Sequence, residues 1–288
     1  MTRYDCCMFY NENDLFEIRL NQHWNFIDKF VVVEAGETHT GLKKELVFDH
    51  ARFEPWASKI EYRSFDSFDL AYQQHPELLD ACALMDRGPN HASADWTRDH
   101  FQYNYMYKVL LELGAQDDDI AYVSCCDEII KQQAFDACAD AIANNTSGQE
   151  MLFMFKYWLY AYKFNMLNKG PDESDSSGGL CRVGVFKHVL PATLRDGRTH
   201  THLFNNAGWH FTFMDNTDGE KILAKQRAWA HSKDQDGRKV KFDNSTKEEA
   251  LARLFADYQL TPVPIHEDTH PQYIIDNQDK FRDYIYTP

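Results

Sequence analysis

Two adjacent acids, Asp127 and Glu128, follow a short apolar run at 120–123. This run is bounded by charge and is too short for a helix, so it predicts a buried β-strand. In open α/β sheets, ligands bind just beyond the carboxyl ends of the strands. Carboxylates at that place suit a divalent cation that holds a phosphate-bearing substrate, because hard cations prefer oxygen ligands. The alternative is a solvated helix N-terminus, where acids are also favoured.

Polar side chains follow two other predicted strands in the same way. The apolar run 6–10 ends at Asn11 and Glu12, and the β-branched run 30–33 ends at Glu34. Helical periodicity between these runs predicts a β-α-β unit, which builds a parallel sheet. Parallel strands would bring all three polar clusters to one edge of the sheet. Acids after the first strands of such a sheet commonly bind a base or a ribose, whereas an acid deeper in the sheet suits a metal.

Phosphate groups would also need positive charge, because the chain has no Gly-rich phosphate-binding loop of either common type. Lys43, Lys44 and Arg98 are candidate cations in the segments that follow the predicted strands. A solvated surface charge is the alternative for each of them.

Nucleophilic catalysis by serine or cysteine is not favoured. The sequence has no Gly-x-Ser-x-Gly elbow. Cys125 and Cys126 precede a predicted helix, a place that lowers the pKa of a thiol, but the nearby acids oppose thiolate formation. His210 stands between Trp209 and Phe211, where a buried core histidine is the alternative to a ligand.

Composition narrows the classes of function. The 288 residues are 43% hydrophobic and 14% aromatic, which predicts a globular chain with a sizeable core. A net charge of −15 without a basic block argues against nucleic acid or an anionic membrane as the main partner. Seven cysteines without zinc-site spacing indicate free thiols in a reducing compartment. With no signal-peptide apolar region and no apolar run near the ~20 residues of a membrane span, we expect a soluble, cytoplasmic protein.

Alternating strands and helices predict an α/β protein, and no linker divides the chain into separate domains. Besides the strands named above, the pattern predicts strands at 60–63, 182–189 and 200–202, a strand or a turn at 208–211, and two strands or one strand and a bend within 151–164. It predicts helices at 47–54, 95–113, 129–143, 219–230 and 242–258. Residues 169–179, rich in Gly, Asp and Ser, predict a flexible acidic loop that could close over a ligand. Residues 66–94 are interpreted as a polar surface excursion.

A series of motifs runs in order through nearly the whole chain. The motifs are CMFYNENDLFEIRL from Cys7, VVVEA from Val31, THTG from Thr38, WTRDHFQYN from Trp96, DDI from Asp118, DEI from Asp127, GWHF from Gly208, and then Lys225 and His231. In this order they resemble glycosyltransferase family 17. That family contains the β-1,4-mannosyl-glycoprotein N-acetylglucosaminyltransferase that adds bisecting GlcNAc, together with many bacterial and viral relatives.

The resemblance implies a GT-A-like glycosyltransferase fold, with a Rossmann-like, mostly parallel central sheet flanked by helices. It implies a single domain over 1–288, in which 1–130 bind the nucleotide sugar and 131–288 complete the metal and acceptor sites. The implied reaction is an inverting transfer from a UDP-sugar, with GlcNAc as the expected sugar, to a glycan or another hydroxyl acceptor. The implied cofactor is a divalent metal, Mn²⁺ first and Mg²⁺ as the alternative. A soluble member of bacterial or viral type is expected.

The resemblance also assigns roles to residues. Asp127 would hold the metal, and His210 would be its second protein ligand. Glu128 would act in catalysis, either as a base or by orienting Asp127 and its waters. The residues expected at the donor are Asn11, Glu12 and Glu34 at the uridine, together with Lys44, Arg98, Asn104, Trp209, Lys225 and His231.

Two positions depart from the pattern of the family. Cys125 stands where relatives usually have the first Asp of an Asp-x-Asp-Glu motif, and a thiol is a weaker ligand for a hard cation. Tyr103 stands where relatives usually have Arg, which removes one phosphate contact. These departures support a rival hypothesis, a catalytically weak relative that binds a nucleotide or a glycan. A second rival keeps the fold but uses another UDP-hexose.

Inverting transfer needs a general base on the acceptor hydroxyl, usually a carboxylate. The sequence leaves this base open. The candidates are Glu128, Asp215, Asp172, Glu173 and Asp175.

Overall fold

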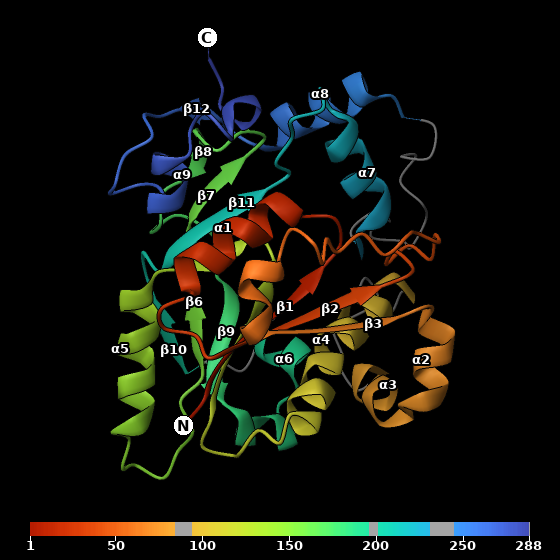
Figure 1. The fold of residues 1–288 in the computed structure, drawn as a ribbon, viewed down its shortest axis with the longest axis vertical. Coiled ribbons are helices and arrows are strands. Elements are labelled where there is room, and N and C mark those ends of the chain that lie inside the picture. The colour runs from red at the N-terminus through yellow and green to blue at the C-terminus, as the bar shows by residue number, and fades with distance from the viewer. Residues whose placement is uncertain (84–93, 196–200, 231–244, 288) are drawn as a thin grey trace.

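The fold is built on a seven-stranded sheet with the strand order β10-β6-β9-β4-β1-β2-β3 (Figure 1). The computed structural model describes residues 1–83, 94–195, 201–230 and 245–287. Strands β3, β2, β1 and β4 are parallel, and β9 runs antiparallel to both β4 and β6. The strands are β1 (Arg3–Phe9), β2 (Lys29–Ala35), β3 (Ile60–Phe65), β4 (Ile120–Cys125), β6 (Phe153–Phe155), β9 (Ser177–Arg182) and β10 (His202–Phe204). The predicted mixed α/β class with a mostly parallel sheet is confirmed.

Helices flank this sheet. In Figure 1, α5 lies to the left of the central strands, and α2 and α3 lie to their right. The α-helices within the described ranges are α1 (Asn13–His23), α2 (Phe68–Gln74), α3 (Pro76–Ala83), α4 (Ala94–Glu112), α5 (Gln132–Ala143), α6 (Pro191–Arg195), α7 (Glu220–Ala228), α8 (Lys247–Asp257) and α9 (Gln272–Asp276). Among these described helices, none has the length and apolar character that crossing a membrane requires.

Both faces of the parallel strands β1, β2 and β4 are buried, which explains their apolar runs. Because successive side chains of a strand point to opposite faces, adjacent valines belong to different core clusters. Val31 packs in the cluster that contains Phe101 of α4. Val32 packs in the cluster that contains Phe16 of α1 and Phe135 of α5. Strand β2 is therefore held on both faces, and its carboxyl end is fixed in position.

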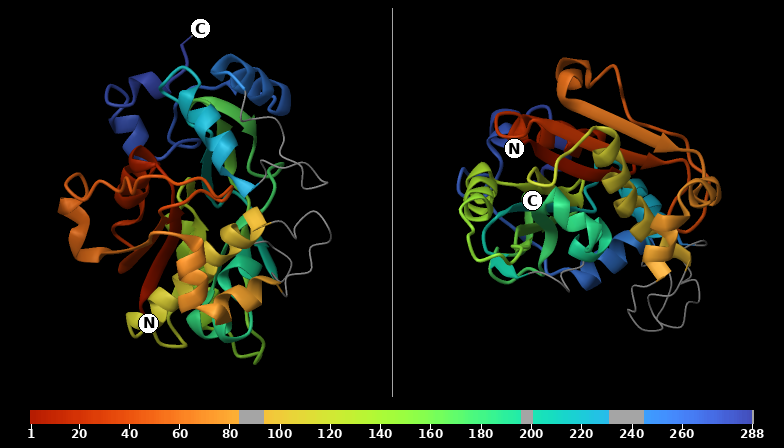
Figure 2. Two further views of the ribbon diagram at one scale, coloured as in Figure 1. Left: turned by 90° about the vertical axis from the view of Figure 1, so that its right-hand side faces the viewer. Right: turned by 90° about the horizontal axis from the view of Figure 1, so that it is seen from below.

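A second, five-stranded sheet has the order β12-β8-β7-β11-β5. Its strands are β5 (Glu128–Ile130), β7 (Trp158–Ala161), β8 (Met166–Lys169), β11 (Gly208–Thr212) and β12 (Thr261–Pro262). Only Cys126 and Asp127 separate β4 of the first sheet from β5 of the second. The N-terminus lies at the lower end of the long axis and the C-terminal end at the upper end in Figure 1 and in the left view of Figure 2. The junction of the two sheets thus falls at the acidic pair.

The helix predicted at 47–54 and the strand predicted at 182–189 differ from the structure. No α-helix forms at 47–54, because the N–H groups of Val47 and Phe48 donate to the Glu34 carboxylate instead. A 3₁₀ helix, with Pro55 in its first turn, begins only at Glu54. The strand expected at 182–189 lies earlier, as β9, and a 3₁₀ helix follows it.

A glycine pair explains a further difference between the predicted and the observed structure. The predicted acidic loop 169–179 is shorter than expected, because Gly178 and Gly179 belong to β9. A Cβ atom on Gly178 would lie 2.7 Å from the Tyr157 hydroxyl, and one on Gly179 would lie 2.5 Å from Leu194. The glycine pair therefore allows close packing within a strand rather than flexibility. Two further differences are that 66–94 contains α2 and α3, and that the helix expected from 129 is preceded by β5.

A buried charge cluster ties β1 to α1. The Arg19 guanidinium donates to both oxygens of Asp5, and Nδ1 of His23 lies 2.7 Å from Asp5 Oδ2. Arg19, His23 and Asp5 are fully buried. Burial opposes ionisation of Asp5, but Arg19 and His23 outweigh it and hold the pKa of this carboxyl at about 2. Asp5 and Arg19 therefore form a charged pair at neutral pH.

This cluster predicts a loss of stability in acid. The pKa of Asp5 is lower in the folded state than the ordinary 3.8, so its stabilising effect is complete above about pH 4 and disappears as the pH falls through about 2. The effect is roughly 2 kcal/mol. We expect the free energy of unfolding, measured with urea at pH 5 and pH 3, to fall less in Asp5→Asn than in the wild type. The exposed Asp118→Asn should keep the wild-type difference, and an unchanged difference in Asp5→Asn would contradict this account.

Candidate active site

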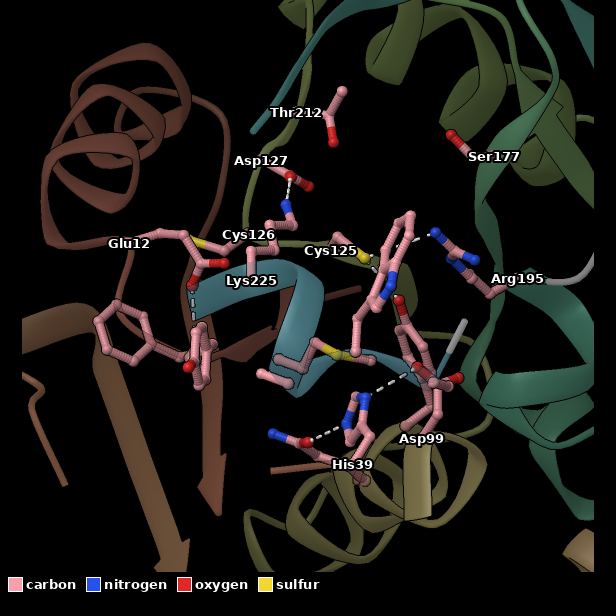
Figure 3. Close-up of a pocket in the computed structure, with 18 of the residues that line it drawn as sticks. Glu12, His39, Asp99, Cys125, Cys126, Asp127, Ser177, Arg195, Thr212 and Lys225 are labelled. Carbon is pink, nitrogen blue, oxygen red and sulfur yellow. Dashed lines mark hydrogen bonds and ion pairs between the residues drawn. The ribbon is translucent and has the colours of Figure 1, made fainter. Parts of the chain in front are cut away.

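A cavity of about 470 Å³ opens at the carboxyl ends of β1, β2 and β4 (Figure 3). Its wall is completed by side chains from α4, α6, β11 and α7, so residues from both 1–130 and 131–288 line it. Its volume lies within the ~300–1,000 Å³ typical of small-molecule sites. The expected sheet edge therefore carries a cavity of the size that a small-molecule ligand needs.

Asp127 lies at the centre of this edge. Its side chain is buried and lines the cavity. Lys225 Nζ lies 2.7 Å from Asp127 Oδ2, and His210 Nε2 lies 3.6 Å from Asp127 Oδ1. The second sheet fixes this arrangement, because His210 pairs with Glu128 across β11 and β5, and the Phe211 N–H donates to the Asp127 carbonyl.

The charges around Asp127 are coupled. Burial opposes ionisation of Asp127, but Lys225 and His210 hold its pKa below the ordinary value. Burial likewise opposes the charge of Lys225, but Asp127 and Glu12 raise the pKa of this amine. For Glu12 the burial effect prevails and its pKa is raised, although Lys225 acts in the other direction. Lys225 is thus a cation that acts electrostatically on both Asp127 and Glu12.

The donor atoms at Asp127 fit a metal that takes part of its coordination from a substrate. Asp127 Oδ1 is buried and has no hydrogen-bond partner among the described residues, and it faces His210 Nε2. Within the described ranges, no group of three His, Cys, Asp or Glu side chains is placed to hold a metal ion. The protein would therefore supply two ligands, leaving positions for phosphate oxygens and water.

Cys125 occupies the place of the missing acid. Its Sγ lies 2.9 Å from the Tyr103 hydroxyl and 3.4 Å from Arg195 Nη2. Burial raises the pKa of the Cys125 thiol, although Arg195 acts in the opposite direction. The residue is therefore a neutral thiol, which suits neither a metal ligand nor a nucleophile.

Arg195 is a cavity residue that sequence reasoning missed. Its guanidinium lies 5.5 Å from the centre of the Tyr103 ring and donates to Glu128 Oε1 at 2.9 Å. The positive charge that the family pattern places at position 103 is thus supplied next to Tyr103 by Arg195 of α6. No local signal could have revealed this, because Arg195 is distant in the sequence and its helix is only five residues long.

Comparison with known proteins identifies the family. The model of glycosyltransferase family 17 matches residues 2–253. The chain belongs to glycosyltransferase family 17. It is therefore a glycosyltransferase, as its ordered motifs suggested.

Two further comparisons were made. A search of curated proteins found no match. Among solved structures, the chain is similar to a 4-diphosphocytidyl-2C-methyl-D-erythritol synthase, with 11% identity, a TM-score of 0.37, and coverage of 89% of this chain and 99% of that one. It is also similar to the 2-C-methyl-D-erythritol 4-phosphate cytidylyltransferase of Francisella tularensis, with 9% identity, a TM-score of 0.31, and coverage of 88% and 99%.

In this family 17 glycosyltransferase, four of the residues expected at the donor or metal lie around the cavity with Asp127. They are Glu12, Lys44, His210 and Lys225. Figure 3 shows Lys225 reaching from α7 to Asp127, with Glu12 on the neighbouring side. Asn11 is exposed and lies beside Glu12, at a smaller cavity of about 40 Å³.

Other expected residues support the walls rather than line the cavity. Glu34 is buried and accepts hydrogen bonds from Lys44 and Tyr62 as well as from two backbone N–H groups. Arg98 donates to the His39 carbonyl, which holds the loop after β2. The Asn104 side chain accepts from the Ala192 N–H of α6.

The remaining expected residues are Trp209, Glu128 and His231. Trp209 points away from His210, as neighbours on a strand must, and its indole donates to the Thr269 carbonyl. Glu128 is fully buried between Arg195 and the Cys125 N–H, so it braces the turn that carries Asp127. His231 lies outside the described residues.

Of the five candidate bases, Asp175 lines the cavity. Asp215 is fully buried and accepts hydrogen bonds from Thr217 and Gly219 at the start of α7. Asp172, Glu173 and Glu128 do not contribute to the cavity wall.

Gly208 predicts a sensitive backbone contact in this enzyme. A Cβ atom here would lie 2.1 Å from the Ile129 carbonyl, so β11 and β5 approach more closely than any side chain allows. We expect Gly208→Ala to displace β11, and with it His210, at a cost of about 1–3 kcal/mol. Thermal unfolding should detect the change, whereas the same substitution at Gly170, which has open space around it, should leave Tm unaltered. A wild-type Tm in Gly208→Ala would contradict the prediction.

Proposed function

We propose that this family 17 protein transfers a sugar from a UDP-sugar, with GlcNAc as the expected sugar, to a hydroxyl group of a glycan or another acceptor. The proposal is supported above all by Asp127, a buried acid at a sheet edge whose free oxygen faces His210. It is also supported by the cations beside Asp127, since a diphosphate carries negative charge that Lys225 and Arg195 would neutralise. The acceptor is proposed only by its chemical class.

We propose Mn²⁺ as the cofactor, with Mg²⁺ as the alternative, and Asp127 and His210 as its protein ligands. A bound ion would supply Lewis-acid stabilisation to the departing diphosphate. The residues of the chain would do the rest. Lys225 holds a fixed positive charge where negative charge develops, and such preorganised charge lowers an activation barrier without reorganisation. Glu12 and Tyr10, at the end of β1, would hold the nucleoside.

We propose inversion at the transferred carbon, with Asp175 as the general base. An inverting enzyme needs a carboxylate that takes the proton of the acceptor hydroxyl as the new bond forms. Asp175 is 97% exposed at the cavity, which leaves space for an incoming acceptor. Chiral analysis of the product and the activity of Asp175→Asn would test both parts of this proposal.

The first experiment is calorimetric titration of the wild-type protein with UDP and UDP-GlcNAc, with and without Mn²⁺. We expect binding of both nucleotides to strengthen with Mn²⁺. A panel of UDP-hexoses in a donor-hydrolysis assay then separates GlcNAc from other sugars. Absence of nucleotide binding in the presence of Mn²⁺ would refute the proposed function.

The rival function, a weak or inactive relative that only binds a nucleotide or a glycan, is favoured by one observation. Cys125 gives a neutral thiol where an acid is usual, and Lys225 already occupies the second oxygen of Asp127. Under the rival hypothesis the metal site has decayed, and its affinity can be restored.

Cys125→Asp distinguishes these functions. If the site is intact as it stands, the added carboxylate pairs with Arg195, which lies 3.4 Å from Sγ, and Mn²⁺ affinity changes little. This is the outcome we expect from titration of Mn²⁺ in the presence of UDP. A gain of more than about tenfold, equivalent to ~1.4 kcal/mol, would instead support the decayed site. Cys125→Asn serves as the uncharged control.

A further inference from the structure

One wall of the cavity carries chemistry that the metal and phosphate groups do not use. Helix α4 presents Trp96, Asp99, Gln102 and Tyr103 to the cavity, a spacing that places them on one helix face. The loop after β2 adds His39. These five residues form the α4 wall of the cavity. The fold brings His39 from the loop after β2 next to the four residues of α4.

The hydrogen bonds of the α4 wall fix the orientation of His39. Gln102 Nε2 donates to the Val33 carbonyl at 2.9 Å, which turns Gln102 Oε1 toward His39. Because that oxygen can only accept, His39 Nε2, 2.9 Å away, must carry a proton. The other ring nitrogen, Nδ1, lies 3.4 Å from Asp99 Oδ1. In neutral His39 this leaves two acceptors side by side at the cavity.

Two adjacent acceptors suit a vicinal diol, which offers two O–H donors from neighbouring carbons. Phosphate is excluded as their ligand, because Asp99 would repel it. The cations that suit a phosphate, Lys225 and Arg195, belong to other parts of the cavity. Figure 3 shows His39 and Asp99 on the side of the cavity remote from Asp127 and Thr212, and Glu12 on a third side.

The α4 wall nevertheless adjoins the phosphate region. Burial opposes the charge of Arg195, but acidic and polarisable neighbours, Asp99 among them, raise the pKa of its guanidinium. The indole of Trp96 adds an apolar surface to the same wall, on which the C–H face of a sugar ring can pack. A group next to a diphosphate that needs both hydroxyl acceptors and an apolar face is a hexose.

We propose that Asp99 and His39 bind vicinal hydroxyls of the transferred hexose and so set the specificity for the donor sugar. The inference rests on the proposed function and deepens it. In GlcNAc the vicinal hydroxyls are those on C3 and C4, so the pair reads the configuration at C4. Gln102 acts as a positioning residue, since it fixes the ring of His39.

The test compares UDP with UDP-GlcNAc, which differ only by the hexose. Both are titrated calorimetrically with Mn²⁺ into wild type, Asp99→Asn and His39→Asn. The matched control is Glu112→Gln, an acid-to-amide change at the exposed end of the same helix. We expect the Kd for UDP to be unchanged in all variants. The Kd for UDP-GlcNAc should rise about tenfold or more in both variants, because Asp99→Asn removes the charge of one acceptor and His39→Asn removes the other acceptor from its place.

Three results would overturn the inference, and they differ from one another. Equal weakening of UDP and UDP-GlcNAc would assign the α4 wall to the ribose diol instead. Unchanged binding of both would show that the wall touches neither. If the wild type binds no nucleotide at all, the proposed function itself fails and the inference fails with it. A loss of discrimination between UDP-GlcNAc and UDP-GalNAc in Asp99→Asn would support the reading of C4.

Discussion

Replacing Asp127 by asparagine is expected to reduce the rate of sugar transfer by on the order of 10³-fold. The variant protein is expected to fold. The side chain keeps its size, but it loses the charge that faces His210 and that pairs with Lys225. Turnover of UDP-GlcNAc and the Mn²⁺ dependence of UDP binding are the two measurements. Both should be lost together, because the proposal assigns one carboxylate to both.

The control for this substitution is Asp118→Asn, the same change at an exposed position before β4. It should leave turnover and metal dependence at the wild-type level. Thermal unfolding of Asp127→Asn tests whether the loss of activity comes from unfolding, since the half-buried Lys225 would lose its ion-pair partner. Retention of Mn²⁺-dependent UDP binding in Asp127→Asn would contradict the metal assignment.

The largest effect on stability is expected from Arg19→Met. The Arg19 guanidinium is fully buried and donates to Asp5, to Ser124, and to the backbone carbonyls of the turn that carries Asp127. Removing it takes the charged donor from the buried Asp5 carboxylate and one donor from each of several carbonyls, at a cost of about 3–5 kcal/mol. Differential scanning calorimetry should show a fall in Tm of roughly 6–20 °C.

A double-mutant cycle identifies the cause. Asp5→Asn combined with Arg19→Met should be less destabilising than the sum of the single changes, because the second substitution removes the charge that the first leaves unpaired. Arg63→Met, at a partly exposed surface pair, should cost less than about 1 kcal/mol. Additive effects in the cycle would show that Arg19 acts through packing rather than through charge.

Much of the architecture could be predicted because its signals are local. Apolar runs that stop at acids correctly located β1, β2 and β4, and the helix between the first two correctly implied their parallel order. The 3.6-residue pattern from Trp96 to Leu110 located α4 to within a residue or two. Segments governed by distant partners were the ones that failed. The helix expected at 47–54 is an example, since its first N–H groups bond to Glu34 on another element.

The candidate site shows the same division. Residue type and strand position predicted Glu12 and Asp127 at the edge where the cavity lies, and the family resemblance added His210. They did not reveal that the Glu34 carboxylate accepts hydrogen bonds from Lys44 and Tyr62 and so does not line the cavity. Nor did they reveal Arg195, because a cation on a short helix has no sequence signal that relates it to position 103. The sequence thus predicted at which edge of the sheet the cavity lies. Long-range packing decides which side chains reach that cavity.

The two-residue connection between β4 and β5 has a consequence for motion. Cys126 and Asp127 are its whole length, and Arg19 donates to the carbonyls of Cys125 and Glu128 on both sides, which restrains rotation of the backbone here. We therefore expect the two sheets to move as one body at the site. Amide hydrogen exchange in β4, β5 and β11 should accordingly be slow without a nucleotide and change little when one binds.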